Sequence, residues 1–214
     1  MERVKVLLKS GRPAKWIFYG DSITHGAVHT FGWRDYTELF TERVRYELGR
    51  MMDVVIKTAI SGDNSRGLLE TFDWRIGQFA PDAVFIMIGM NDCSEQQIPP
   101  DEFAGNLHAL VEKIAALGGH PVLQTTCPIL PGTAPDREPY FPRYMEIVRT
   151  VAKERRLPLV DHARYWEENS DKLYYWMSNG FHPNEFGHRA FASLLFREMG
   201  ISEPAGSTCK LFFP

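Results

Sequence analysis

The chain has 214 residues, enough for one domain spanning 1–214 that buries roughly 70% of the surface its unfolded form exposes. Its composition is 44% hydrophobic and 24% charged with a net charge of -3, so it carries no basic excess that would favour nucleic acid as a partner. No stretch reaches the about eighteen apolar residues of a membrane span, and the first residues lack the apolar run of a signal peptide, so we expect a cytoplasmic protein.

Five short runs of the sequence are apolar or β-branched throughout, a pattern that favours strands buried on both faces of a sheet. They cover residues 16–19, 54–56, 83–88, 121–125 and 157–160. Longer segments with helical spacing lie between them. The clearest is 103–117, where apolar side chains recur every three or four residues before the Gly118-Gly119 stop. Similar spacing begins at Trp33 after the first run and at Phe186 near the end of the chain.

This alternation of strands and helices is typical of right-handed βαβ units. We therefore expect an α/β fold, a three-layer α/β/α sandwich with a mostly parallel sheet of about five strands. In open sheets of this kind, ligands bind beyond the carboxyl ends of the strands. Ser22, Gly62 and Asn91 follow the first three strands, and His182 precedes the last helix. The topology predicts that these four residues meet at one edge of the sheet.

Ser22 and His182 form a candidate pair of nucleophile and general base. The serine lies in the motif Gly20-Asp21-Ser22 and the histidine in His182-Pro183. A serine hydroxyl is a weak nucleophile until a base takes its proton, and histidine is the usual base because its pKa lies near neutrality. Each residue alone also fits a turn, a helix cap or a loop, so the pair needs support from the rest of the chain.

Four blocks in a fixed order supply that support, at residues 20–26, 61–64, 88–92 and 181–184. Together they resemble the SGNH hydrolases, also called the GDSL esterase and lipase family, whose four letters correspond here to Ser22, Gly62, Asn91 and His182. The resemblance extends from the first strand to the last helix. It implies a flavodoxin-like fold and a carboxylic ester hydrolase that needs no cofactor and no metal.

The resemblance also implies a role for each block. Ser22 would attack the ester carbonyl and form a covalent acyl intermediate, with His182 as its base. The backbone N–H groups of Ser22 and Gly62 and the side-chain amide of Asn91 would form the oxyanion hole, because preplaced donors favour the charge that develops in the transition state. From the residues alone, Gly62 also fits a turn and Asn91 a helix cap.

Asn179 stands where most members of the family have an aspartate, which holds the catalytic imidazole and stabilises its protonated form. Three interpretations are open: a Ser-His dyad oriented by the Asn179 oxygen or a backbone carbonyl, a substitute carboxylate, or loss of most activity. The nearby Asp171 and Glu185 are poorly placed to substitute, and Asp21 and Asp92 are expected to bind loop backbone. We favour the dyad, and expect Asn179→Asp to change the rate far less than the about 10⁴-fold effect of the corresponding change in a serine protease.

Other site chemistries find no support in the sequence. His182 and His188 straddle a helix start without any zinc-binding spacing, so no metal is expected. No glycine-rich nucleotide-binding motif follows the first strand. Cys93, Cys127 and Cys209 are odd in number and far apart, which predicts reduced structural thiols.

Aromatic side chains near the two motifs bear on the substrate, a small-molecule ester. They are His29, Phe31, Trp33, Tyr174, Tyr175 and Trp176. They favour either a sugar-binding cleft or core packing, and we expect short-chain acyl esters such as acetylated saccharides, in line with a resemblance to intracellular acetylxylan esterases of the family. The alternative is a non-catalytic or weakly active protein that binds an ester or a carbohydrate. The apolar segment 211–213 would pack on the domain or on a neighbouring subunit, so a homo-oligomer is also open.

Overall fold

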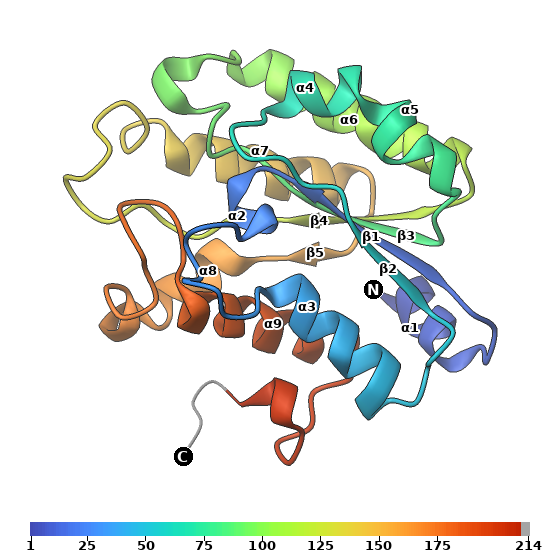
Figure 1. Cartoon of the computed structure of the whole chain (residues 1–214). Coiled ribbons are helices and arrows are strands. Elements are labelled where there is room, and N and C mark those ends of the chain that lie inside the picture. The colour runs from blue at the N-terminus through green and yellow to red at the C-terminus, as the bar shows by residue number, and fades with distance from the viewer. Residues whose placement is uncertain (211–214) are drawn as a thin grey trace.

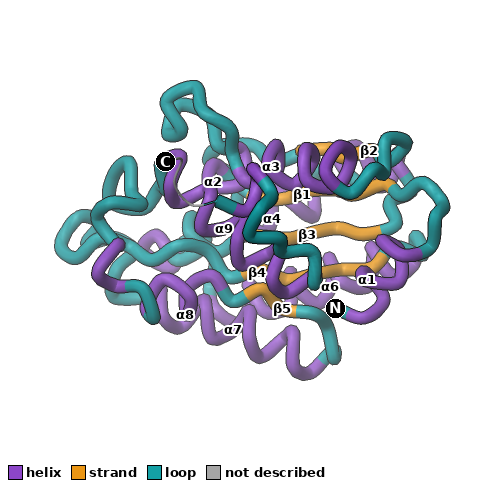
Figure 2. Tube along the Cα trace, turned by 90° about the horizontal axis from the view of Figure 1, so that it is seen from below, coloured by secondary structure: helices purple, strands orange, loops and turns teal. Residues whose placement is uncertain are grey.

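A five-stranded parallel sheet forms the centre of the computed structural model, which describes residues 1–210. The strands are β1 (Lys15–Gly20), β2 (Val54–Lys57), β3 (Ala83–Met87), β4 (His120–Gln124) and β5 (Leu159–Val160). Their spatial order is β2-β1-β3-β4-β5 (Figure 2). Every neighbouring pair is parallel, so the expected α/β fold is confirmed. The apolar segment 211–213, on which a subunit contact was expected, lies outside the described residues.

Helices cover both faces of this sheet. The α-helices are α1 (Glu2–Lys9), α2 (Ser22–His25), α3 (Tyr36–Glu42), α4 (Ser65–Glu70), α5 (Phe72–Arg75), α6 (Pro100–Ala116), α7 (Phe141–Glu154), α8 (His162–Glu167) and α9 (Glu185–Met199). A π-helical segment (Arg43–Glu47) and 3₁₀ turns at Gly77–Phe79, Ser94–Gln96, Ser170–Lys172 and Ser207–Cys209 complete the elements. Figure 1 shows α4, α5, α6 and α7 on one face of the sheet and α3, α8 and α9 on the other. Within residues 1–210, no helix has the length and apolar character needed to cross a bilayer.

The expected helix at 103–117 is confirmed as α6, and the one that begins near Phe186 as α9. The helix after the first strand starts later than expected, since Trp33 lies in a turn before α3 and is 63% exposed. The reason is a capping box: the Asp35 side chain accepts hydrogen bonds from the backbone N–H groups of Thr37 and Glu38, and the Glu38 carboxylate accepts one from Asp35. This cap starts the helix after Trp33 and leaves the tryptophan on the surface.

Aromatic packing holds the middle of the sheet against α3. Phe18 of β1 stacks on Phe85 of β3 with ring centroids 4.8 Å apart, and Phe40 of α3 meets Phe18 edge-on at 5.0 Å. Trp16 adds a second edge-on contact with Phe40 at 5.7 Å. All four rings are fully buried, and each such side chain stabilises the fold by about 1.5–3 kcal/mol. This packing fixes the strand whose carboxyl end carries Ser22.

The carboxyl ends of β1 and β3 lie at the topological switch point of the sheet. From β1 the chain adds β2 on one side, and from β3 it adds β4 and β5 on the other. The register pairs Gly20 with Met87 at these two ends. Because the connections leave in opposite directions, a crevice opens at such a point, and Ser22 and Asn91 follow the two strands that border it.

Candidate active site

Ser22 is the first residue of α2, directly after the carboxyl end of β1. The Asp21 carboxylate accepts a hydrogen bond from the backbone N–H of Ile23 at 2.9 Å and so caps this short helix. A Cβ atom at position 20 would collide with the carbonyl oxygen of Met87 on the neighbouring strand. Gly20 therefore leaves the space that the turn needs, Asp21 caps the short helix, and Ser22 carries the hydroxyl at the start of that helix.

The structure brings Ser22 and His182 together across most of the sequence. The distance from Ser22 Oγ to His182 Nε2 is 2.8 Å. The histidine lies in a tight loop that Ser178 closes by donating its backbone N–H to the His182 carbonyl at 2.8 Å. The stretch after β4 braces this loop, since Leu130 donates its N–H to the Gly180 carbonyl at 2.7 Å. The two candidate catalytic side chains are thus in direct hydrogen-bond contact.

Asn179 lies against the other nitrogen of the same imidazole. Its Oδ1 is 3.1 Å from His182 Nδ1, and it also accepts the backbone N–H groups of Phe181 at 3.1 Å and His182 at 3.0 Å. Backbone N–H groups only donate, so the side-chain atom that faces both of them is the oxygen. An acceptor at this place requires a proton on Nδ1, which leaves Nε2 free to accept the serine proton.

Burial, together with the nearby His29, Arg137 and His188, lowers the pKa of His182 to about 4. The ring is 9% exposed. Among residues 1–210, no carboxylate contacts its Nδ1, and Asp171 and Glu185, the two nearby acids of the sequence, make no contact with it. The imidazole is therefore neutral, and able to act as a base, throughout the neutral range.

The three residues expected to form the oxyanion hole, Ser22, Gly62 and Asn91, have N–H groups that no other protein atom within residues 1–210 is seen to accept. In the described part of the chain, neither the backbone N–H of Ser22 nor that of Gly62 donates to another protein atom. Gly62 has φ +85°, a left-handed conformation that favours glycine. The Asn91 amide donates one N–H to the Asp63 carbonyl at 2.8 Å, which joins the loops after β2 and β3 and leaves its second N–H.

Arg75 supports this arrangement, although no pattern in the sequence identifies it as a residue of the site. Its guanidinium is buried, pairs with Asp63, and donates to the carbonyls of Thr58 at 2.8 Å and Gly20 at 3.3 Å. It therefore ties the end of β1 to the loop that carries Gly62. A single arginine on a short helix has no distinctive spacing, so only the folded chain identifies it.

Asp21 and Asp92 bind loop backbone, as expected. The Asp92 carboxylate accepts the backbone N–H of Ser65 at 2.9 Å, and Asp21 accepts that of Ile23. Burial raises the pKa of Asp21 to about 7 and that of Asp92 to about 6. Both acids hold the loops around Ser22 and Asn91 without touching the serine hydroxyl.

The six aromatic side chains expected near the site divide into three groups. Trp176 is fully buried, packs edge-on against Trp166, and so belongs to the core instead of a cleft wall. His29 stacks on the His182 ring. The other four are exposed, with fractions between 50% and 69%; they are Phe31, Trp33, Tyr174 and Tyr175.

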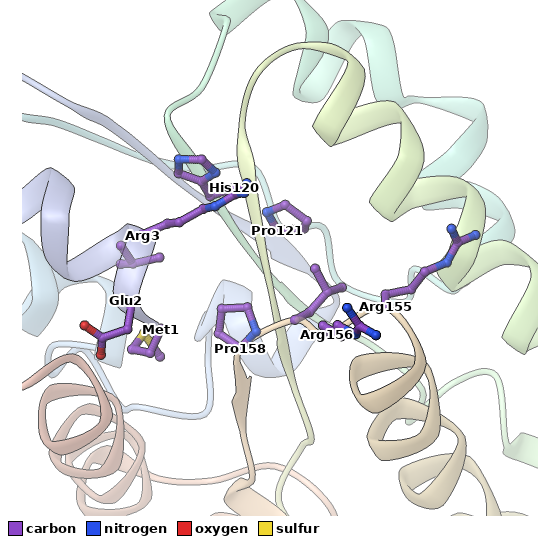
Figure 3. A pocket seen from close by; sticks show the side chains of 10 residues that line it. Met1, Glu2, Arg3, His120, Pro121, Arg155, Arg156 and Pro158 are labelled. Carbon is purple, nitrogen blue, oxygen red and sulfur yellow. The ribbon is translucent and has the colours of Figure 1, made fainter.

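A cavity of about 420 Å³ lies at the opposite edge of the sheet, between α1 and the starts of β4 and β5 (Figure 3). Its lining includes Arg3, His120, Arg155 and Arg156 but no serine or cysteine. The guanidinium of Arg155 points away from the cavity toward α6, where it meets His108 and Glu112. The cavity is therefore separate from Ser22 and His182.

Known proteins resemble this chain in sequence and in fold. The model of the GDSL-like lipase/acylhydrolase family matches residues 18–190. An acetylxylan esterase of Geobacillus stearothermophilus is 28% identical over 91% of this chain and 97% of its own length. The crystal structure of Axe2, an acetylxylan esterase of the same organism, matches with a TM-score of 0.74 and 25% identity over 87% of this chain and 94% of that one.

The structure of LAE5, an α/β-hydrolase enzyme from the metagenome of Lake Arreo in Spain, matches with a TM-score of 0.75. Its identity is 22% over 88% of this chain and 95% of that one, so it supports the fold alone. The matched structures also include catalytic mutants of Axe2 in which a serine, a histidine or an aspartate is replaced by alanine.

Proposed function

From the premise that this chain belongs to the GDSL-like lipase/acylhydrolase family and is a carboxylic ester hydrolase, we propose that it acts through a covalent acyl-Ser22 intermediate. We propose further that it removes short acyl groups, acetyl above all, from saccharides. The single sheet of residues 1–210 supports one catalytic domain.

The observation that carries the mechanism is the chain of hydrogen bonds from Ser22 Oγ through the His182 ring to Asn179 Oδ1, at 2.8 and 3.1 Å. It contains a nucleophile, a base with an unprotonated Nε2, and an acceptor that holds the base in that tautomer. This geometry activates a serine even though the third residue is an amide instead of a carboxylate.

In the first half-reaction, His182 Nε2 takes the hydroxyl proton as Ser22 Oγ bonds to the ester carbonyl carbon. The N–H groups of Ser22 and Gly62 and the remaining N–H of Asn91 bind the carbonyl oxygen as it becomes negative, each donor worth about 3 kcal/mol. The imidazolium then gives its proton to the alcohol oxygen, which leaves. Water repeats the sequence on the acyl-serine and releases the carboxylic acid.

Exposed aromatic side chains beside the site support a carbohydrate substrate. Phe31 and Trp33 belong to the loop after α2, and Tyr174 and Tyr175 to the segment before the histidine loop, and these loops meet where His29 contacts Asn179. Exposed aromatic rings present flat apolar surface with little loss of side-chain entropy, which suits a sugar ring. The name of the relative from G. stearothermophilus, acetylxylan esterase, points to the same substrate class.

Hydrolysis of esters of graded chain length tests this function. We expect activity on p-nitrophenyl acetate and on acetylated xylo-oligosaccharides, weaker activity on p-nitrophenyl octanoate, and covalent labelling of Ser22 by a fluorophosphonate. Ser22→Ala should remove both hydrolysis and labelling, because the proposed acyl intermediate forms on the Ser22 hydroxyl. Ser170→Ala, at an exposed serine outside the four motif blocks, is the matched control and should retain both.

Labelling at another residue, or full activity of Ser22→Ala, would contradict the proposed nucleophile. A preference for octanoyl over acetyl esters would contradict the short-chain substrate while leaving the mechanism in place. The two parts of the proposal are thus tested separately.

A further inference from the structure

His29 lies face to face with the candidate catalytic histidine. The ring centroids of His29 and His182 are 3.7 Å apart and the planes differ by 11°. The Nδ1 atom of His29 also lies 3.5 Å from Nδ2 of the Asn179 amide. Asn179 therefore contacts both histidines, with its oxygen toward one ring and its amide nitrogen toward the other.

An amide fits between these two rings because it is both a donor and an acceptor. Its oxygen requires a proton on His182 Nδ1, and its N–H requires a free lone pair on His29 Nδ1. Burial lowers the pKa of His29, which favours that neutral form. An aspartate at position 179 would offer acceptors to both rings. The hydrogen-bonding needs of the two histidines therefore fit an asparagine at position 179 better than an aspartate.

The base of the loop that carries His29 is fixed by hydrogen bonds. Lys57 donates to the His25 carbonyl at 2.7 Å and pairs with the Asp35 carboxylate. Thr30 Oγ1 donates to the Gly26 carbonyl at 3.2 Å. These bonds tie the loop after α2 to the start of α3 and to the end of β2.

The backbone beside His29 is strained. Val28 and Phe31 have φ angles of +69° and +53°, a region that side chains other than glycine rarely adopt. Both side chains are exposed, at 82% and 68%, so their own burial does not explain the conformation. Strain of this kind persists only where the surroundings hold it, and it is concentrated at functional sites. Here the strained residues flank the loop position whose ring stacks on His182.

We propose that His29 is a positioning residue of the esterase. Its ring packs on one face of the His182 ring, and its Nδ1 orients the Asn179 amide so that the amide oxygen faces His182 Nδ1. The role rests on the proposed function of Ser22 and His182. It explains how the site operates with an asparagine in place of an aspartate: two neutral groups, a stacked ring and an oriented amide, hold the imidazole that a carboxylate would otherwise hold.

The test compares His29→Ala, which removes ring and acceptor, with His29→Phe, which keeps a flat ring. On p-nitrophenyl acetate we expect His29→Ala to lower kcat at least tenfold with KM within twofold of the original protein. His29→Phe should recover kcat to within threefold. Adding Asn179→Asp to His29→Ala should also recover most of the loss, because a carboxylate accepts the Nδ1 proton in either orientation. His108→Ala, on α6, is the matched control.

Nitrogen NMR of the histidine rings gives a readout that needs no substrate. We expect a proton on Nδ1 of His182 and on Nε2 of His29 in the original protein, and a mixture of His182 tautomers in His29→Ala. A kcat of His29→Ala within twofold of the original, or an unchanged His182 tautomer, would overturn the proposal. A failure of Ser22 labelling would instead overturn the proposed function, and the NMR result would separate the two cases.

Discussion

At the residue scale, Asn179 can orient His182 only if its oxygen, and not its amide nitrogen, faces the ring. The backbone N–H groups of Phe181 and His182 both point at that oxygen, at 3.1 and 3.0 Å. In a serine protease, the corresponding asparagine stabilises the wrong tautomer, and activity falls about 10⁴-fold. Here these two N–H groups, together with His29 beside the Asn179 amide nitrogen, favour the right one. What the asparagine does not supply is the negative charge that stabilises the imidazolium.

Burial of His182, with no carboxylate at position 179 to offset it, predicts an unusual pH dependence. Only neutral His182 accepts the serine proton, so kcat/KM falls as the pH drops through the pKa of His182, which is lowered to about 4. Burial of the ring is the main cause of the lowered pKa, and His29, Arg137 and His188 also oppose protonation. We expect the acid limb of the profile near pH 4. In Asn179→Asp the new carboxylate favours the imidazolium, so the limb should move to higher pH.

The measurement is kcat/KM for p-nitrophenyl acetate from pH 3.5 to 8, roughly the range that spans these pKa values. Circular dichroism at each pH separates unfolding from titration. Asp171→Asn, which removes an exposed acid near the motif, should leave the limb in place. A limb near the ordinary histidine value of about 6.5 in the original protein would contradict this account.

At the scale of elements, the turn from β1 into α2 depends on the lack of a side chain at Gly20. A Cβ there would meet the Met87 carbonyl oxygen of β3, which is backbone and cannot move without disturbing the sheet. We expect Gly20→Ala to destabilise the protein by about 3 kcal/mol or more, or to prevent folding, because it overpacks the sheet end.

Gly105 in the middle of α6 is the matched control. A Cβ added there meets nothing within 4 Å, so Gly105→Ala should raise stability by about 0.5–1 kcal/mol through helix propensity alone. Urea denaturation of both variants checks the pair. Equal stability of the Gly20 variant and the original protein would show that β1 and β3 tolerate a wider separation at the site.

At the scale of the whole molecule, the site combines loops that lie far apart in the sequence. The loop after α2, which carries Trp33, meets the histidine loop where His29 contacts Asn179, and the segment before the histidine loop carries Tyr174. We expect Trp33→Ala to raise KM for acetylated xylo-oligosaccharides about fivefold, because one aromatic contact is worth about 1 kcal/mol. KM for p-nitrophenyl acetate should not change.

Trp74→Ala is the matched control, since Trp74 is exposed to a similar degree, 66%, on α5 beside the edge strand β2. It should alter neither KM. If Trp33→Ala changed KM for the small aryl ester and the oligosaccharide equally, the tryptophan would act on the reacting centre and not on the sugar.

Much of this molecule was predictable because the signals are local. Buried parallel strands read as continuous apolar runs, and α6 shows both its helical spacing and its glycine stop. Ser22 and His182 were predictable as a pair because each follows a recognisable motif and the topology brings strand ends to one edge. The start of α3 was misplaced because Trp33 fits the helical spacing, while the Asp35 cap decides where the helix begins.

The sequence by itself determined the parallel sheet, the positions of its strands and the four blocks of the candidate site, since hydrophobic periodicity and short motifs are properties of neighbouring residues. Only the tertiary structure decided which way the Asn179 amide points, that His29 stacks on His182 although the two are far apart in the sequence, and that Arg75 ties the loop that carries Gly62 to β1. These depend on backbone groups and rings contributed by other loops, and side-chain orientation follows from those partners once the chain has folded.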